Sequence, residues 1–215
     1  MTQSDSIPLS AVMPAYNEEG AIADAVAEIR QSVLDPLPGA ELIVVNDGSR
    51  DRTGAILDEL AKQDPRVRVI HQPNGGHGRA LRTGLEAARG EYCFLLDSDR
   101  QIPLDEFAAL WQAAQGRDGA FGVRWPRRDP LLRLILTRVI RLFLRAVFRA
   151  RLRDANVPFK IIRRSVWRAA REFIPDDTIA PSLFLALYAA KRGLDIAERP
   201  VRHRPRSTGV VSIRR

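Results

Sequence analysis

Short apolar runs recur along the chain, and each leads through a polar or glycine-rich loop into a helical pattern. Most of these runs lack the alternation of a half-exposed strand, which predicts strands that are covered on both faces. The expected strands lie at residues 7–13, 42–45, 67–70, 92–96, 120–123, within 154–164, and at 196–201. The expected helices lie at residues 21–29, 54–62, directly after 74–78, and at 104–115, 165–172 and 182–191. This alternation predicts an α/β fold with a mostly parallel central sheet and helices on both faces.

Two details of the first loop follow from residue type. Pro14 is expected to break the first strand, because proline has no N–H to donate to a neighbouring strand. Asn17 is a candidate cap for the helix that follows, with Glu18 and Glu19 favourable near the positive end of that helix.

The apolar run at residues 92–96 stops in Asp97, Ser98 and Asp99. In open α/β sheets, ligands bind beyond the carboxyl ends of the strands. Two carboxylates one residue apart at such an end suit Mg²⁺ or Mn²⁺ that holds substrate phosphates. A solvated turn is the alternative, since Asp and Ser are common turn residues.

A glycine-rich loop at residues 74–78 precedes a helical pattern. Glycines in this position let backbone N–H groups approach an anion. The loop matches neither the G-x-G-x-x-G pattern of dinucleotide-binding folds nor the G-x-x-x-x-G-K-[ST] pattern of P-loops. The sequence therefore argues against both NAD enzymes and P-loop NTPases.

Composition narrows the class of protein. At 215 residues, 45% hydrophobic and 28% charged, the chain predicts one globular domain spanning residues 1–215. Cys93 is the single cysteine, so no disulfide framework is expected and a reducing, cytoplasmic compartment is favoured. The chain starts with neither a basic nor an apolar segment, and no apolar run reaches the length of a membrane-spanning helix. We therefore expect neither a signal peptide nor a bilayer crossing.

The charge pattern points to an anionic partner. The 34 Lys and Arg exceed the 26 Asp and Glu by a net +8, which suits a nucleotide, a phospholipid surface or nucleic acid. Residues 129–153 form a basic amphipathic pattern, with Arg138, Arg141, Arg145 and Arg149 on one face and aliphatic side chains on another. Such a helix, from about residue 130 to 153, is typical of binding to an anionic membrane surface. An ordinary surface helix packed on the sheet is the alternative.

Four segments in order, residues 12–19, 44–53, 74–78 and 96–103, resemble the motifs of the family 2 glycosyltransferases of GT-A fold. The Asp-x-Asp-x-Gln-x-Pro form, together with residues 154–164 and the Arg-x-x-Gly at 206–209, looks like the branch that makes polyprenyl-phosphate sugars. The resemblance covers nearly the whole chain. It implies a GT-A, Rossmann-like nucleotide-diphospho-sugar transferase fold.

The resemblance also implies roles for individual residues. Pro14, Ala15, Tyr16 and Glu18 would hold the base and ribose of a nucleotide-sugar donor, and Asp47 would hydrogen-bond the base.

For the phosphates, it implies a metal site made of Asp97, Asp99 and Gln101, with Asp97 and Ser98 toward the nucleotide. Arg124, Arg138 and Arg206 would meet phosphates of the donor or the acceptor.

Asp154 is the best-placed carboxylate on the acceptor side by the same likeness. Beside an anionic nucleophile, it is expected to orient Lys160 or an arginine rather than to accept a proton, because a phosphate monoester is already largely ionised near pH 7.

The chain departs from the family pattern in three places. His77 stands where the family has a lysine, so a phosphate contact there would depend on pH. Arg100 replaces a usual aliphatic residue. Val211 and Ser212 replace a frequent Ser-Lys pair, which leaves the closure of the C-terminus over the donor in question.

The sequence thus predicts a metal-dependent, inverting glycosyltransferase that moves a sugar from GDP-mannose or a UDP-sugar to a polyprenyl phosphate, peripherally bound at the cytoplasmic membrane face. One alternative is a family 2 transferase with a glycan, another lipid or a soluble hydroxyl as acceptor. A second is a nucleotide-sugar binder without activity. Nucleic acid is not expected as a partner, because the arginines are interleaved with aliphatic rather than aromatic residues.

Overall fold

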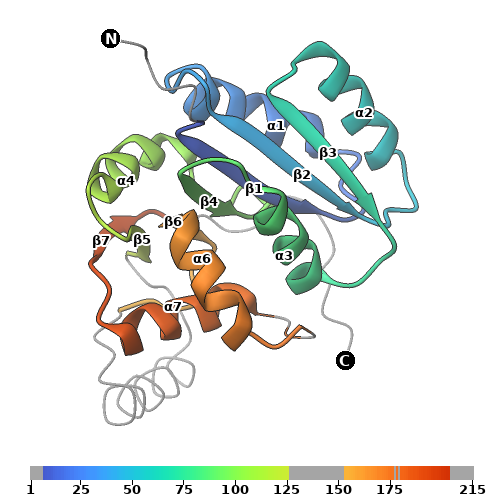
Figure 1. Cartoon of the computed structure of the whole chain (residues 1–215). Coiled ribbons are helices and arrows are strands. Elements are labelled where there is room, and N and C mark those ends of the chain that lie inside the picture. Colours follow the sequence, from blue (N-terminus) through green and yellow to red (C-terminus); the bar gives the residue numbers. More distant parts are fainter. Residues whose placement is uncertain (1–6, 126–152, 177, 179, 204–215) are drawn as a thin grey trace.

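The structure is a computed structural model that describes residues 7–125, 153–176, 178 and 180–203. In these residues, seven strands form one sheet in the order β3-β2-β1-β4-β6-β5-β7 (Figure 1). The strands are β1 (Leu9–Ala15), β2 (Glu41–Asp47), β3 (Val67–Gln72), β4 (Tyr92–Leu96), β5 (Gly119–Arg124), β6 (Phe159–Arg163) and β7 (Ile196–Val201). The α-helices are α1 (Ile22–Ile29), α2 (Thr53–Gln63), α3 (His77–Ala87), α4 (Phe107–Ala114), α6 (Arg164–Ala170) and α7 (Pro181–Arg192). A π-helical turn, η1 (Arg30–Leu34), and two 3₁₀ turns, η2 (Leu104–Glu106) and η3 (Arg171–Phe173), extend them.

The sheet is mostly parallel, as the sequence predicts. Strands β1 to β4 pair in parallel through β1–β2, β1–β4 and β2–β3, and β5 pairs in parallel with β7. Strand β6 is the exception, since it runs antiparallel to both β4 and β5. Because β4 and β5 both oppose β6, they point the same way. The C-terminal ends of β1, β2, β3, β4 and β5 therefore lie at one edge of the sheet.

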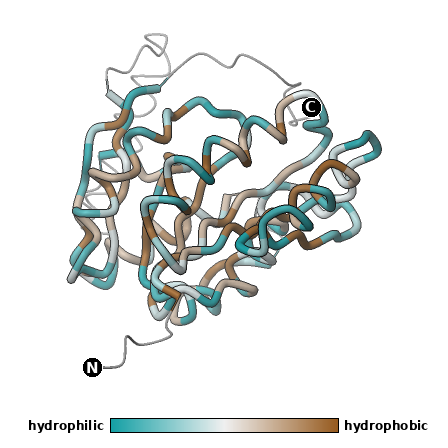
Figure 2. Tube along the Cα trace, turned by 90° about the horizontal axis from the view of Figure 1, so that it is seen from above, coloured by the Kyte–Doolittle hydropathy of each residue, from teal (hydrophilic) through white to brown (hydrophobic). Residues whose placement is uncertain are grey.

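Each face of the sheet carries its own apolar core. One core joins α1, α2 and α4 to the sheet, and at its centre the Phe94 ring lies 5.1 Å from Phe107 and 4.9 Å from Phe159. The other core joins α3, α6 and α7 to the opposite face around Phe121 and Trp167. Figure 2 shows the hydrophobic segments mainly in the interior and the hydrophilic ones on the outer turns. Cover on both faces explains why the apolar runs do not alternate with polar residues.

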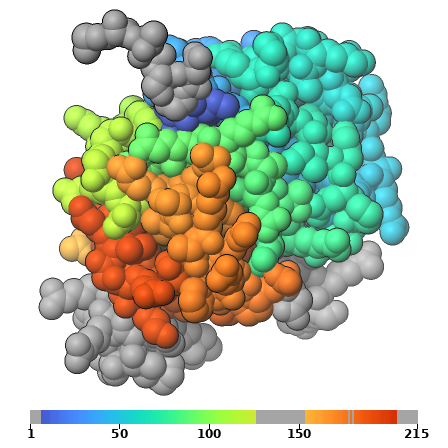
Figure 3. Space-filling view, in the orientation of Figure 1, coloured from blue at the N-terminus to red at the C-terminus, as the bar shows by residue number. Residues whose placement is uncertain are grey.

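Helix α3 lies close to the sheet because Gly84 carries no side chain. A Cβ at this position would come within 2.4 Å of Val12 Cγ1 and 3.1 Å of Val45 Cγ2. On the same face, α3 lies beside the segment that follows β6 (Figure 3), and Arg82 of α3 pairs with Asp176 at 2.7 Å. Helix α3 and the α6–α7 segment together cover one face of the sheet.

The structure corrects the expectation that Pro14 breaks the first strand. Strand β1 continues to Ala15, and Pro14 lies opposite Val45 of β2. Pairing of β1 with β4 ends at Val12. Beyond that residue the strand has one neighbour, so the missing N–H of proline need not remove a bond from the sheet.

The expected cap of α1 is also wrong. The N-cap residue is Ala21, which makes no side-chain capping bond. The N–H groups of Ala21 and Ile22 donate to the backbone oxygen of Glu18 instead. The side chain of Asn17 is used elsewhere, in a contact between two loops.

Candidate functional site

The predicted site residues that the structure describes meet at one edge of the sheet. Pro14 and Ala15 end β1, Asp47 ends β2, Asp97 follows β4, and Arg124 ends β5. The parallel strand directions bring these residues, far apart in sequence, to the edge where open α/β sheets bind ligands.

The residues predicted to hold the base and ribose differ in accessibility. Pro14 and Ala15 are buried, whereas Tyr16 and Glu18 are half-buried at the start of the loop after β1. Only the second pair presents side-chain surface to solvent in this structure.

Hydrogen bonds join the loop after β1 to the loop after β2. The Asn17 N–H donates to Ser49 Oγ at 3.0 Å, and the Arg50 N–H donates to Asn17 Oδ1 at 2.8 Å. The Glu18 N–H donates to Thr53 Oγ1 at 2.8 Å. Asn17 adopts a φ of 52°, in the left-handed region that asparagine tolerates better than most residues. Hydrogen bonds therefore hold the two loops together beside the expected base site.

Asp47 organises the glycine-rich loop after β3. Its Oδ1 accepts the Gly75 N–H at 2.9 Å and the Gln72 side-chain amide at 2.7 Å, and its Oδ2 accepts the Gly76 N–H at 2.8 Å. Asp47 is buried. Both carboxylate oxygens thus have protein partners, and the hydrogen bond to a nucleotide base stays a prediction.

A neighbouring network was not foreseen from the sequence. Asn46 Nδ2 lies 2.9 Å from His71 Nδ1, and His71 Nε2 lies 2.9 Å from Asp58 Oδ1. The Asn46 Oδ1 accepts the Ser49 N–H at 3.1 Å. The strand ends at Asp47 rather than at residue 45, so the expected loop residue Asn46 belongs to β2 and faces β3.

The aspartates after β4 take different surroundings. The Asp97 Oδ1 lies 3.6 Å from His77 Nε2 at the start of α3, and both side chains are partly exposed. Ser98 is buried. The Asp99 Oδ1 accepts the backbone N–H of Gln101 at 3.1 Å, which stabilises the turn.

Arg100 ties this turn to helix α1. Its backbone has a φ of 55°, and its side chain leaves the turn toward Glu28 Oε2 at 2.8 Å and Asp24 Oδ2 at 3.4 Å. The arginine that replaces an aliphatic residue is therefore paired with carboxylates on the helix surface.

The residue types at the turn fit a hard divalent cation. Asp97, Asp99 and Gln101 offer carboxylate and amide oxygens, the donors that Mg²⁺ and Mn²⁺ prefer. Among the residues that the structure describes, no three or more His, Cys, Asp or Glu side chains form a cluster that would complete a metal site alone. An ion here would take its other ligands from substrate phosphates and water, which is common for Mg²⁺.

Beside the end of β5, Arg124 and Asp154 form a forked ion pair. Arg124 Nε donates to Asp154 Oδ2 at 2.7 Å, and its Nη2 donates to Oδ1 at 2.9 Å. The Asp154 side chain is 1% exposed and the Arg124 side chain 24%. The two residues that the sequence assigned to separate roles are thus direct partners.

Lys160, at the start of β6, is fully buried. Its Nζ donates to Ser182 Oγ at 2.7 Å and to the backbone oxygen of Val157. Burial lowers the pKa of Lys160 to about 7 from its ordinary 10.5; attraction by Asp154 opposes this shift and repulsion by Arg124 adds to it. The only signal in the sequence was a lysine within an apolar run, and nothing marked its partner on α7.

Two predicted phosphate contacts, Arg138 and Arg206, lie outside the described residues, as does nearly all of the expected basic helix at about 130–153. In the part of the chain that is described, no helix is long and apolar enough to span a bilayer.

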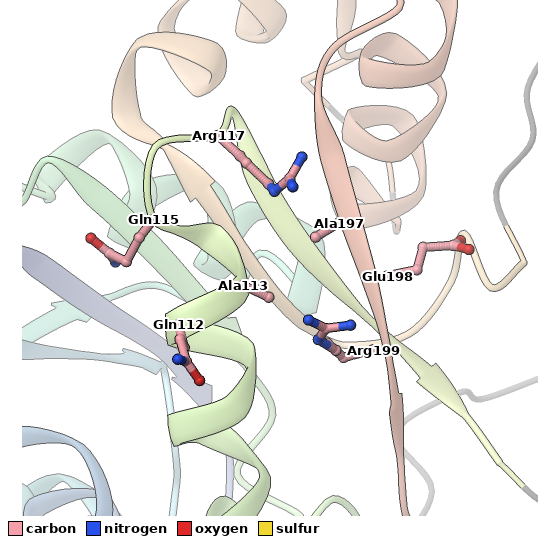
Figure 4. Close-up of a pocket in the computed structure, with 7 residues that line it drawn as sticks. All are labelled: Gln112, Ala113, Gln115, Arg117, Ala197, Glu198 and Arg199. Atoms are coloured by element: carbon pink, nitrogen blue, oxygen red, sulfur yellow. The ribbon is translucent and has the colours of Figure 1, made fainter.

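A groove of about 530 Å³ lies elsewhere, between α4 and β7 (Figure 4). Gln112 and Ala113 of α4 line one side, and Ala197 and Arg199 of β7 line the other. It contains none of the predicted site residues, and Arg117 at its end is already paired with Asp195.

Known structures share this architecture. The mannosyltransferase PcManGT from Pyrobaculum calidifontis, in complex with GDP-Man and Mn²⁺, matches with a TM-score of 0.68 and 20% identity over 95% of this chain and 59% of that chain. Glucosyl-3-phosphoglycerate synthase from Mycobacterium tuberculosis, in complex with Mn²⁺, UDP-Glc and phosphoglyceric acid, matches with a TM-score of 0.67 and 22% identity over 94% and 72% of the two chains. The fold is that of the GT-A glycosyltransferases, which confirms the predicted fold class.

The sequence of the chain narrows this class. The profile of glycosyl transferase family 2 matches residues 10–170, and the chain belongs to that family. The undecaprenyl-phosphate 4-deoxy-4-formamido-L-arabinose transferase of Pseudomonas aeruginosa is 31% identical over 178 residues, which cover 81% of this chain and 52% of that protein. The chain spans between 31% and 52% of the length of the first curated relatives that it matches.

Proposed function

We propose that this chain transfers a sugar, with inversion, from a nucleotide-diphospho-sugar to the phosphate of a polyprenyl lipid. The observation that carries the proposal is the pair formed by Arg124 and Asp154. A carboxylate that accepts two hydrogen bonds from a guanidinium is held in its charged form and is a poor proton acceptor. Asp154 therefore suits the task of orienting Arg124 better than the task of a general base.

A phosphate acceptor removes the need for a base. The second pKa of a phosphate monoester is about 6, so its attacking oxygen is largely ionised at neutral pH, unlike the hydroxyl of a sugar. Arg124, fixed in place by Asp154, presents a planar donor group of the kind that binds phosphate well. The side chains of this region would thus bind and position an acceptor that is already a nucleophile.

On the donor side, the cross-linked loops after β1 and β2 would hold the base and ribose beside Tyr16 and Glu18. Asp99 and Gln101, with Asp97 toward the nucleotide, would hold a divalent ion. Such an ion supplies Lewis-acid stabilisation of the leaving nucleoside diphosphate. His77, across from Asp97, would lie near the same phosphates.

The relatives support both halves of the proposal in different ways. The Pseudomonas aeruginosa relative carries undecaprenyl phosphate in its name. The two solved structures hold Mn²⁺ with GDP-Man or with UDP-Glc. Either base therefore remains a candidate for the donor. The net charge of +8 supports a further part of the proposal, peripheral binding to the anionic cytoplasmic face of a membrane.

The donor can be identified first, by thermal-shift screening of nucleotide-sugars with Mn²⁺. Transfer to a polyprenyl phosphate is then measured for wild type, Asp99→Ala and Asp154→Asn at saturating donor. We expect Asp99→Ala to lose nearly all turnover. Asp154→Asn keeps the shape of the side chain and one of its two acceptor oxygens, and should retain a measurable rate. Addition of EDTA to wild type should strongly weaken donor binding in calorimetry.

A folded Asp154→Asn variant as inactive as Asp99→Ala would show that Asp154 is a true base and would favour a hydroxyl acceptor. Undiminished donor binding and turnover without metal would remove the role of Asp99 and Gln101. If the protein transferred sugar to soluble glycans and not to a polyprenyl phosphate, the proposed acceptor would be wrong.

A further inference from the structure

The fully buried Lys160 is not used by the proposed function. Its amine lies 5.5 Å from the centre of the Phe121 ring and donates to Ser182 Oγ and to the Val157 oxygen. Burial of an amine is costly unless its protons have partners. Lys160 meets this requirement through Ser182 and Val157, and its contact with Ser182 has a consequence for the serine hydroxyl.

The contact with Lys160 fixes the direction of the Ser182 hydroxyl. In its protonated form Lys160 has three donors and no acceptor, so in that form Ser182 Oγ accepts and its own proton points elsewhere. Among the described residues, the acceptor that an interaction joins to the Ser182 hydroxyl proton is the Val157 oxygen at 3.5 Å, at the outer limit of a hydrogen bond. The hydroxyl proton is thus available to a better acceptor.

The place of this hydroxyl in the fold is on the acceptor side. Lys160 lies opposite Leu95 of β4, two residues before Asp97. The charges of Asp154, Arg124 and Asp97 all act on the Lys160 amine. Ser182 is the second residue of α7 and is half-buried.

We propose that the Ser182 hydroxyl donates a hydrogen bond to a phosphate oxygen of the acceptor, and that Lys160 is the positioning residue that presents it. This inference rests on the proposed function, since it deepens the acceptor half of that site. The shared chemistry is a phosphate monoester, whether on a polyprenyl lipid or on a soluble molecule.

The test separates acceptor binding from donor binding. We expect Ser182→Ala to raise the KM for a short-chain polyprenyl phosphate roughly tenfold, the usual effect of losing a hydrogen bond to a charged group. The affinity for donor and metal, measured by calorimetry, should stay unchanged. Ser182→Thr, which keeps the hydroxyl, should restore most of the acceptor affinity, and Ser165→Ala, at an exposed serine on α6, is the matched control.

Lys160→Met should raise the same KM. The double variant, Lys160→Met with Ser182→Ala, should have a KM no higher than that of the more impaired single variant, because both changes remove the same hydrogen bond to the acceptor. A soluble alkyl phosphate is assayed in parallel: a rise in KM for both acceptors assigns the contact to the phosphate itself, as expected.

An unchanged acceptor KM in folded Ser182→Ala would overturn the inference and leave Lys160 with a structural role. Equal losses of donor and acceptor affinity would overturn it too. A failure of the proposed function looks different, because wild type itself would then transfer to a hydroxyl and to no phosphate, which ends both proposals before any variant is compared.

Discussion

The regions that we propose as the donor side and the acceptor side differ in the kind of contact that holds them. The donor side consists of loops whose backbone N–H groups are held by short polar side chains, such as Asn17, Asp47 and Thr53. The acceptor side contains two buried charged groups with polar partners: Asp154 pairs with Arg124, and Lys160 with Ser182. The donor side is held by many hydrogen bonds between loops. The acceptor side is held by a few buried contacts, and losing any one of them should cost much stability.

This difference has a physical consequence. Loss of one loop hydrogen bond costs about 1 kcal/mol, because neighbouring bonds and water compensate. Loss of one partner of a buried ion pair leaves a charge without solvation and costs several times more. Single substitutions on the acceptor side should therefore reduce stability as well as activity, whereas those on the donor side should mainly affect ligand binding.

The largest effect that we predict is on binding to an anionic membrane, where a lipid acceptor would lie. Changing Arg138, Arg141, Arg145 and Arg149 together to Gln should release the protein from anionic liposomes, since each arginine near such a surface contributes roughly 1 kcal/mol. Co-sedimentation at low salt measures this, and wild type should also dissociate as salt screens the attraction. Unchanged co-sedimentation of the variant, or a wild type that never binds, would mean that this segment is not a membrane contact.

The next largest effect tests the buried pair directly. Arg124→Ala should lower the free energy of unfolding by about 3 kcal/mol, because the buried Asp154 would lose the guanidinium that balances its charge. Urea unfolding measures the change. Replacing both partners, in Arg124→Met with Asp154→Leu, should recover much of the loss. A single variant as stable as wild type would show that the acceptor side does not depend on this pair.

The sequence predicted structure best where the signal is local, within one short segment of the chain. Strands β4 and β7 match the expected 92–96 and 196–201. For β4 the reason is an uninterrupted apolar run that ends in polar residues. The same apolar run at 92–96 also predicted that Asp97 would follow a buried strand. The loops after β1 and β2 are each continuous in sequence, so their positions at the strand ends could be predicted, whereas their contacts with a donor stay a prediction.

The acceptor side could not be predicted in the same way. The antiparallel direction of β6 depends on the packing of residues distant in sequence, and no local pattern encodes it. The pairs between Arg124 and Asp154 and between Lys160 and Ser182 form only once β5, β6 and α7 are in place. Even on the donor side, Asn17 had two possible uses, and contact with the second loop prevailed over capping.

The pH dependence of stability should reveal Lys160. Its folded pKa of about 7 lies below the ordinary 10.5, so between these values the unfolded chain binds more protons and wild-type stability rises with pH. Lys160→Met lacks this dependence. The stability of the variant relative to wild type should therefore fall by about 2 kcal/mol between pH 7 and pH 9, at up to about 1.4 kcal/mol for each pH unit.

Urea unfolding at several pH values measures this change, and Lys191→Met, at an exposed lysine of α7, is the control that should follow wild type. Parallel curves for wild type and Lys160→Met would mean that Lys160 stays protonated across this range when folded.

The smallest effect belongs to the donor side, at Arg100. Its ion pairs with Glu28 and Asp24 are partly exposed and should contribute less than about 1 kcal/mol. Its φ of 55° is unfavourable for a residue with a side chain and costs glycine nothing. Arg100→Ala should therefore lose the ion pairs and keep the strain, while Arg100→Gly should lose the ion pairs and relieve the strain. We expect Arg100→Gly to be the more stable of the two in urea unfolding. If both variants instead lost as much stability as Arg124→Ala, the donor side would depend on single charged contacts as much as the acceptor side does, and the contrast between the two would not hold.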